Sequence, residues 1–435
     1  MALTVGPSKR RDEWRGFFGG KTWNPDAFRA LIDSDDPGSA FFEIETQING
    51  LYRSRQMLGA PSGPGVMDTP RFKAEWLNAN SRAAREALGP LQRDLDLGIM
   101  AWIRRASCLS AVIGAGVTMD AGGPSWTELV RRLLVLATTR GHEIAEMREE
   151  PGGTPESRSW KRVVTATKHL EPPALTRAQE ILALIESGNA DTEALMEATQ
   201  LCLDLMGQHM FADITQILYE NDRLPGPIHN SIADLAAPQF VPDRGGDFPG
   251  WDSLITYNFD NLMGEALDAR GLARASYAMS GDQIGGDPNE LALAAGQKSL
   301  HQRIYHLHGY TPRKNFLITH VQFVFSTAQY LRTYKNRDGI IDFVFRSWLA
   351  NPIHHALYIG CSFLDDAMND LLRDAAETLP GRYHYAFLKW PGDQAYERST
   401  PQEIAEQGAA YELIGVRPVW FDRFDEIPEF IRRLA

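Results

Sequence analysis

The sequence feature that most constrains the fold is residues 109–126, LSAVIGAGVTMDAGGPSW. Its first five residues are almost all apolar and end at a glycine turn, Gly114-Ala115-Gly116, which predicts a buried parallel strand followed by a turn. A second turn contains Pro124, and Ser125 is placed to cap a helix that starts near Trp126.

A strand, a glycine turn and a helix start are the parts of a phosphate-binding loop. Glycine lets the backbone approach a ligand closely, and the free N–H groups at a helix start favour an anion. The alternative is an ordinary strand-to-loop turn, because the stretch lacks the full G-x-G-x-x-G spacing. The stretch alone leaves both interpretations open.

Composition narrows the class of protein. The 435 residues are 43% hydrophobic and 23% charged, which is typical of a soluble globular chain with two or three domains or one domain with insertions. No apolar run approaches the about 18 residues of a membrane helix, and the N-terminus lacks the apolar core of a signal peptide. We therefore expect a cytoplasmic protein with no membrane partner.

Charge and cysteine content exclude two further classes. The net charge of −12 argues against direct nucleic-acid binding, and we interpret Lys9-Arg10-Arg11 and Arg104-Arg105 as solvated surface. The three cysteines, Cys108, Cys202 and Cys361, are scattered, so we expect neither a disulfide framework nor a zinc ribbon.

Short apolar runs alternate with helical patterns from residue 107 onward. This alternation predicts an α/β fold, a Rossmann-like, doubly wound and mostly parallel sheet. We divide the chain into a helical N-terminal region, 1–103, and an α/β domain, 104–435, with a helical insertion at about 140–250. Three helices are predicted in the insertion, at 177–187, 192–206 and 210–220, and no strand.

Polar residues follow three later strands. A buried strand at 254–257 precedes Asn258 and Asp260, which places both at the carboxyl edge of the sheet, where ligands bind in open α/β folds. The alternative is that Asn258 forms a turn and Asp260 caps a helix. Another strand, 356–360, ends in a glycine turn that is followed by Ser362 and Asp365.

The segment 304–309, IYHLHG, is predicted to form a strand that ends at His308-Gly309. Strand alternation puts His306 and His308 on the same side. No carboxylate or cysteine lies near them at a ligand spacing, so no metal site is expected.

Four segments in this order, GAGVTMDAGGPSW, TYNFDNL, HLHG and GCSFLDD, resemble the motifs of the SIR2 (sirtuin-like) superfamily of NAD-consuming enzymes over about residues 107–435. Two departures separate the chain from the protein deacylases of that superfamily. Three cysteines cannot form their four-cysteine zinc ribbon, and Ser125-Trp126-Thr127 stands where they usually have Asp-Phe-Arg. The chain is more similar to bacterial SIR2-like NAD hydrolases of antiphage defence, which act alone or beside a HerA-type ATPase or an Argonaute.

The resemblance implies a set of roles for particular residues. His308 would be the general base on water, because imidazole titrates near neutral pH. Asn258 would orient a ribose hydroxyl or that water, and Asp260 would bind the nicotinamide carboxamide and favour the developing positive charge. The NAD-binding residues implied are Gly114, Ala115 and Gly116 through their N–H groups, with Thr118, Pro124, Ser125, Trp126, Gly360, Ser362 and Asp365.

We therefore expect an NAD+ glycohydrolase that releases nicotinamide and ADP-ribose. NAD is the substrate, and no metal is needed. Because uncontrolled NAD hydrolysis would kill the host, we expect a homo-oligomer held inactive until an infection triggers it, alone or with a HerA-type ATPase or Argonaute-like partner. The alternatives are an NAD-dependent protein deacylase and a non-catalytic subunit that senses NAD or ADP-ribose.

Overall fold

The computed structural model describes residues 90, 92–105, 107–149, 160–207, 210–241, 246–272, 274–280, 283–284, 302–311, 313, 324, 349, 354–363, 366–378 and 383–435. Most of the predicted N-terminal region, 1–103, lies outside the described residues. Its last part forms the helix α5 (Gln92–Arg105).

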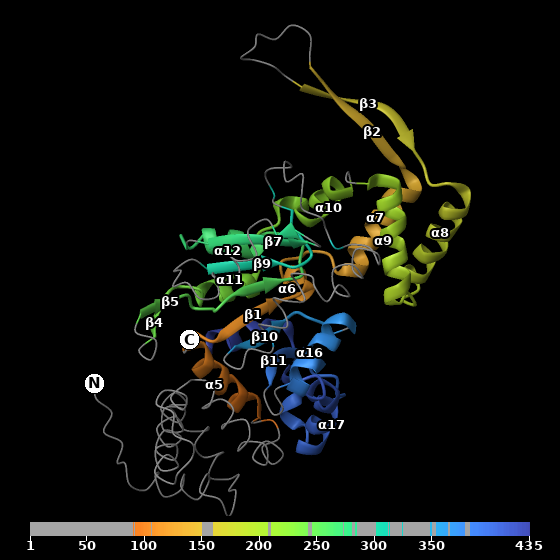
Figure 1. Cartoon of the computed structure of the whole chain (residues 1–435). Coiled ribbons are helices and arrows are strands. Elements are labelled where there is room, and N and C mark those ends of the chain that lie inside the picture. Colours follow the sequence, from red (N-terminus) through yellow and green to blue (C-terminus); the bar gives the residue numbers. More distant parts are fainter. Residues whose placement is uncertain are drawn as a thin grey trace, which may run out of the picture.

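The predicted α/β fold is confirmed by a central eight-stranded sheet (Figure 1). The strand order is β12-β11-β10-β1-β6-β9-β7-β8, and every neighbouring pair is parallel except β7 with β8. The strands are β1 (Leu109–Ile113), β6 (Leu254–Thr256), β7 (Arg274–Ser280), β8 (Gln283–Ile284), β9 (Gln302–His306), β10 (His355–Ile359), β11 (His384–Lys389) and β12 (Val416–Phe421).

Alternate residues of the central strands enter two different hydrophobic cores. On β1, Leu109 and Ile113 contribute to the core on one face, whereas Val112 contributes to the core on the other. On β10, Leu357 and Tyr358 divide in the same way. Because both faces of a doubly wound parallel sheet are covered, its strands are apolar at nearly every position, which explains why these runs were readable in the sequence.

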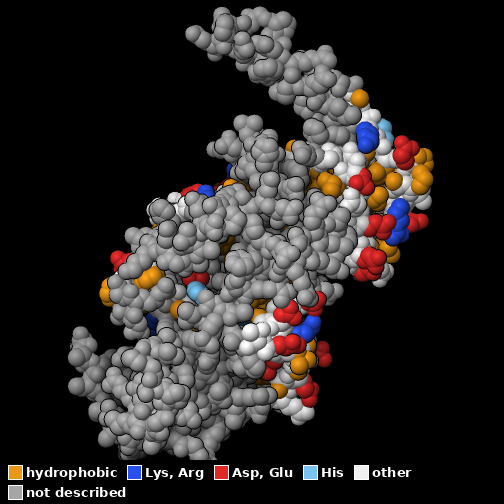
Figure 2. Space-filling view, in the orientation of Figure 1, with side chains coloured by type: hydrophobic (Ala, Val, Ile, Leu, Met, Phe, Trp, Pro, Cys, Tyr) orange, Lys and Arg blue, Asp and Glu red, His pale blue; other side chains and the backbone are white. Residues whose placement is uncertain are grey.

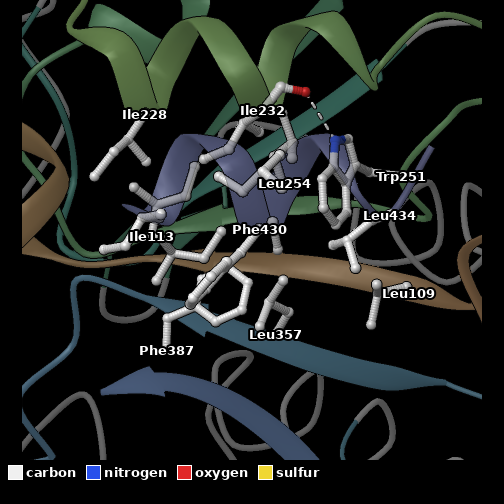
Figure 3. Close-up of a cluster of buried hydrophobic side chains, with 14 of the residues drawn as sticks. Leu109, Ile113, Ile228, Ile232, Trp251, Leu254, Leu357, Phe387, Phe430 and Leu434 are labelled. Carbon is white, nitrogen blue, oxygen red and sulfur yellow. Dashed lines mark hydrogen bonds between the residues drawn. The ribbon is translucent and has the colours of Figure 1, made fainter. Parts of the chain in front are cut away.

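Helices cover both faces of the sheet. α5, α11 (Pro227–Asp234), α12 (Leu262–Asp268) and α18 (Ile427–Arg432) contribute to the first core. There the indole of Trp251 donates a hydrogen bond to the Ile232 carbonyl, 2.9 Å away, and Phe430 faces the strands (Figure 3). α16 (Asp366–Thr378) and α17 (Pro401–Glu412) contribute to the second core.

The region between β1 and β6 contains the predicted helices, but the prediction that it has no strand was wrong. α8 (Pro172–Glu186), α9 (Thr192–Met206) and α10 (Met210–Leu218) form a third hydrophobic core with α7 (Trp126–Thr139). We call these four helices the helical cluster. Acidic and basic side chains are interspersed on its outer face (Figure 2), and Arg177 of α8 pairs there with Glu197 of α9 at 2.7 Å.

Strands that the sequence analysis missed form two hairpins in the same region. β2 (His142–Glu149) and β3 (Trp160–Lys168) make an antiparallel ribbon that extends away from the sheet (Figure 1). β4 (Gln239–Val241) and β5 (Gly246–Phe248) make a shorter one. A ribbon of two strands has no large buried face, so it does not require the apolar alternation that marks a strand in a sequence.

The glycine turn after β1 lies against the glycine turn after β10. A Cβ atom at Gly114 would lie 2.4 Å from the Gly360 carbonyl oxygen, and one at Gly116 would lie 2.8 Å from the Gly360 Cα. Gly360 itself has a φ of +69°, a conformation that glycine adopts without strain. The two turns therefore approach at backbone distance, which only residues without side chains allow.

We predict that Gly116→Ala lowers the free energy of unfolding by about 1–3 kcal/mol, because the new methyl group meets backbone that is held by both strands. Gly116 lies in a short helix, α6 (Ala115–Asp120), where alanine would otherwise be favoured. Urea denaturation of the purified variant measures the change.

Gly408→Ala is the matched control. Gly408 lies inside α17, and its added methyl group would come no closer than 3.9 Å to Pro418. Its free energy of unfolding should be unchanged or raised by up to about 1 kcal/mol. A Gly116→Ala protein as stable as the Gly408→Ala protein would contradict the prediction.

Candidate functional site

The carboxyl ends of β10, β1, β6 and β9 lie side by side at one edge of the sheet. The chain leaves β1 for β6 on one side and returns to β10 on the other, so the strand order reverses at β1. Such a switch point is where open α/β sheets bind ligands. Three of the predicted segments, those around Gly114, Asn258 and Gly360, follow the strands at this point, and His308 follows the neighbouring strand β9.

A chain of hydrogen bonds joins the first two segments. The Asn258 side-chain amide donates to the Gly114 carbonyl and to the Thr118 hydroxyl, both at 2.9 Å. The Thr118 hydroxyl in turn donates to Asp260 Oδ2 at 2.5 Å. We call this series, Gly114–Asn258–Thr118–Asp260, the Asn258 chain; its three side chains are all buried.

The direction of every bond in the Asn258 chain is fixed from its two ends. A backbone carbonyl can only accept, so the Asn258 Nδ2, and not its oxygen, must face Gly114. A carboxylate can likewise only accept, so Thr118 must donate to Asp260 and accept from Asn258. The chain therefore sets the orientation of the Asn258 amide without ambiguity.

This orientation leaves one Asn258 atom for another partner. Its Nδ2 is fully used, and the hydrogen bonds that Asn258 makes with other described residues involve its Nδ2 and its backbone amide but not its Oδ1. Asp260 is more fully engaged, because its Oδ1 accepts the Leu262 amide at 3.0 Å while Oδ2 binds Thr118. Asn258 is thus presented as an acceptor for an O–H or N–H group.

The glycine turn differs from the expectation that all three of its amides are available to a phosphate. The Gly114 amide donates to the Ile359 carbonyl and the Gly116 amide to the Gly360 carbonyl, both at 2.9 Å. Within the described part of the chain, only the Ala115 amide of the three has no backbone acceptor. The two glycines serve the close approach of the turns, which the sequence pattern does not distinguish from a phosphate contact.

Contacts between aromatic rings connect Trp126, at the end of the Pro124-Ser125-Trp126 segment, to His308. The Trp126 ring lies 6.3 Å from the Phe259 ring, and the His308 ring lies 6.3 Å from Phe259 and 5.2 Å from Tyr257. Ser125 caps α7 as predicted, its hydroxyl accepting the Glu128 amide at 3.1 Å. These contacts place Trp126, Asn258 and His308 around one region of the sheet edge.

The segment after β10 lies on the other side of β1. Ser362 is exposed just beyond Gly360, and Phe363 holds a φ of +57°, which is unusual for a residue with a side chain and is found at ligand sites. Pro124, before the Ser125 cap, is partly buried. Asp365 lies outside the described residues.

His306 is separated from His308 by the end of the strand. β9 ends at His306, and a turn follows in which the Gly309 amide donates to the His306 carbonyl at 3.3 Å. The His306 ring is fully buried, stacks on Tyr310 with ring centres 4.3 Å apart, and has no hydrogen-bond partner among the described residues. His308 therefore lies in the turn beyond the strand, where strand alternation no longer fixes the side that a ring faces.

No group of three or more His, Cys, Asp or Glu residues is placed to hold a metal ion within the described ranges. In the same ranges no helix is both long and apolar enough to cross a membrane.

Two residues near the site had no signal in the sequence. Tyr219, which follows α10, hydrogen-bonds both the loop of Asn258 and the loop of His308. Thr311, three residues beyond His308, is its partner in the second of these bonds. Neither residue lies in a recognisable motif, and the contact joins positions 92 residues apart in the chain.

We predict that Thr118→Val lowers the free energy of unfolding by about 2–3 kcal/mol, because the Asn258 amide and Asp260 Oδ2 both lose a buried partner at almost constant side-chain volume. Thermal or urea unfolding measures the loss. Thr118→Ser retains the hydroxyl and should lose only about 1 kcal/mol, the contribution of one buried methyl group. Equal losses for the two variants would contradict this role of the hydroxyl.

A second prediction concerns pH. Burial lowers the pKa of His306 from 6.5 to about 3. Below pH 6.5, His306 therefore binds a proton in the unfolded chain but not in the folded chain. The free energy of unfolding should therefore fall between pH 7.5 and pH 5, with His306 alone contributing about 2 kcal/mol.

Replacing His306 with Phe, which can still stack on Tyr310, removes this contribution and should flatten the pH dependence by that amount. The measurement is urea denaturation of the wild type and the variant at both pH values. His169→Phe, at an exposed position, controls for the exchange of a histidine for phenylalanine outside the core. An unchanged slope in His306→Phe would show that the ring is not held neutral.

Comparison with known proteins accords with this geometry. No curated protein matches the chain. Residues 252–412 match the family model described as a SIR2-like domain, a segment that contains Asn258, Asp260, His308 and Ser362. SIR2-like domains are in general NAD-dependent enzymes, and the match supports the assignment of the chain to the SIR2-like superfamily.

Proposed function

We propose that the chain is an NAD+ glycohydrolase that cleaves NAD+ with water to nicotinamide and ADP-ribose. The observation that carries the proposal is the Asn258 chain at the switch point of the sheet. It uses every donor of the Asn258 amide internally and leaves Oδ1 to accept from a substrate hydroxyl or a water molecule.

The reaction breaks the bond between the anomeric carbon of the ribose and the nicotinamide nitrogen. The electron pair of this bond leaves with nicotinamide, and positive charge develops on the ribose ring. Asp260 supplies negative charge close to Asn258 through the shared Thr118 hydroxyl, and a buried carboxylate near developing positive charge lowers the barrier. The burial of Asp260 strengthens this effect, because little water screens it.

Water then forms the new bond to the anomeric carbon and gives up one proton. We assign the acceptance of this proton to His308, whose ring is partly exposed and lies beside Tyr257 and Phe259. On the binding side, the Ala115 amide and the exposed Ser362 are the groups of the two touching turns that we assign to the diphosphate and the adenosine ribose.

Two alternatives use the same fold. An NAD-dependent deacylase is disfavoured, because three cysteines cannot build the zinc ribbon of such enzymes. A non-catalytic NAD or ADP-ribose sensor would need the turns but not an acceptor at Asn258 or a base at His308. Incubation with NAD+ and with an acyl-lysine peptide separates the three, since they yield ADP-ribose, deacylated peptide or unchanged NAD+ respectively.

The biological setting that we propose rests on the resemblance to bacterial SIR2-like NAD hydrolases of antiphage defence. An enzyme that depletes NAD+ harms its own cell, so we propose that it acts as an antiphage effector, held inactive in a homo-oligomer or beside a HerA-type ATPase or Argonaute-like partner. Phage challenge of cells with and without the gene, with NAD+ measured over time, tests this setting.

We predict that Asn258→Ala and His308→Ala each lower kcat for NAD+ hydrolysis by about 10²–10³-fold, since each removes a group that acts on the reacting atoms. Asn258→Asp should be impaired as well, because a carboxylate would face the Gly114 carbonyl and repel it. Chromatography of nicotinamide and ADP-ribose gives the rates.

Asn189→Ala, in the loop between α8 and α9, and His169→Ala, just after β3, are the matched controls; both residues are exposed, and both variants should retain wild-type rates. Full activity in both Asn258→Ala and His308→Ala would overturn the residue assignment. Absence of ADP-ribose from the wild-type protein, tested alone and with lysate of infected cells, would overturn the proposed activity.

A further inference from the structure

The helical cluster reaches into the site through its hydrophobic core. The side chains of Phe259 and Leu262 belong to the same buried group as Leu133, Cys202 and Ile214 of the helical cluster. Phe259 stands between Asn258 and Asp260 in the chain. A displacement of the helical cluster would therefore displace the backbone that carries both polar residues.

Tyr219, at the end of α10, adds a polar connection. Its hydroxyl accepts the Asn261 amide and donates to the Thr311 carbonyl, each at 2.7 Å. Burial, aided by the negative charge of Asp260, raises the pKa of Tyr219 above its ordinary value, so the phenol remains protonated and able to donate. One hydroxyl thus bridges the loop after β6 and the loop after β9.

Thr311 is held from three directions. Its amide donates to the Phe259 carbonyl at 2.7 Å, its carbonyl accepts from Tyr219, and its hydroxyl is hydrogen-bonded to Thr215 of α10. Arg313, two residues further on, stacks on the Tyr219 ring at 4.6 Å and pairs with Glu265 of α12 at 3.0 Å. The segment that follows His308 is consequently fixed both to the helical cluster and to the loop after β6, residues 257–261, which we call the Asn258 loop.

We propose that Tyr219 is a positioning residue through which the helical cluster sets the placement of His308 relative to Asn258 and Asp260. The inference rests on the proposed function for its catalytic consequence, whereas the structural coupling does not depend on that function. Tyr219 touches no reacting atom in this role. A small misplacement of reacting groups lowers turnover strongly even when the substrate still binds.

The test compares Tyr219→Phe, which keeps the ring and its stacking on Arg313 but removes the hydroxyl, with Tyr396→Phe. Tyr396 is also buried, but it belongs to the core of α16 and α17, whereas Tyr219 shares a core with Phe259 and Leu262. We expect kcat for NAD+ hydrolysis to fall about 10- to 100-fold in Tyr219→Phe with KM changed less than threefold, and to be unchanged in Tyr396→Phe. Thr215→Val, which removes the hydrogen bond between the Thr215 and Thr311 hydroxyls, should lower kcat by a smaller factor.

Hydrogen–deuterium exchange of the full chain supplies a readout that needs no NAD+. Peptides that cover 257–262 and 304–311 should exchange faster in Tyr219→Phe than in the wild type or Tyr396→Phe. In a His308→Ala background, Tyr219→Phe should cause a smaller further loss of kcat than in the wild type, because the positioned base is already absent.

The outcomes separate the inference from the proposed function. Unchanged exchange in both peptides would overturn the coupling whatever the activity. Faster exchange with wild-type kcat, or a loss confined to KM, would overturn the positioning role. Faster exchange in a protein whose wild type forms no ADP-ribose would support the coupling and reject the glycohydrolase.

Discussion

The hydrogen bond from the Asn258 amide to the Gly114 carbonyl connects the fold of this protein to its site. The carbonyl belongs to a turn that is fixed against Gly360 at backbone distance, so its position is set by the sheet itself. The hydrogen bond to this carbonyl fixes the side chain of Asn258, and the Thr118 hydroxyl links that side chain to Asp260. The polar groups are thus ordered by main-chain geometry, which requires no bound ligand to assemble them and reduces the entropy lost on binding.

Much of the sheet could be predicted from the sequence, because strands that are buried on both faces are apolar at nearly every position. The apolar runs predicted at 109–113, 254–257 and 356–360 correspond to β1, β6 and β10. The second and third runs placed Asn258 and Ser362 just beyond the carboxyl ends of their strands. The Ser125 cap was readable for a local reason, since it involves residues three apart. Segments with local signals therefore appeared where the sequence indicated them.

The remainder depends on contacts between distant residues. Thr118 was grouped with the NAD-binding positions, but its hydroxyl is occupied by residues 140 and 142 positions away, which no spacing reveals. The glycine amides were interpreted as phosphate donors because the pattern is the same whether a glycine approaches a ligand or another turn. The six-residue helix α6 is too short to show a period, and the β2–β3 ribbon pairs, among the described strands, only within itself.

The position of the helical cluster in the chain, between two neighbouring strands of the sheet, bears on how such a segment can change during evolution. β1 and β6 are direct neighbours, with Ala111 paired to Leu254, although the helical cluster lies between them in the chain. The start and end of the intervening segment are therefore anchored side by side, and lengthening such a segment adds little closure entropy. One inserted unit is therefore exchangeable for another while the register between β1 and β6 persists, and the edge of the sheet keeps its geometry.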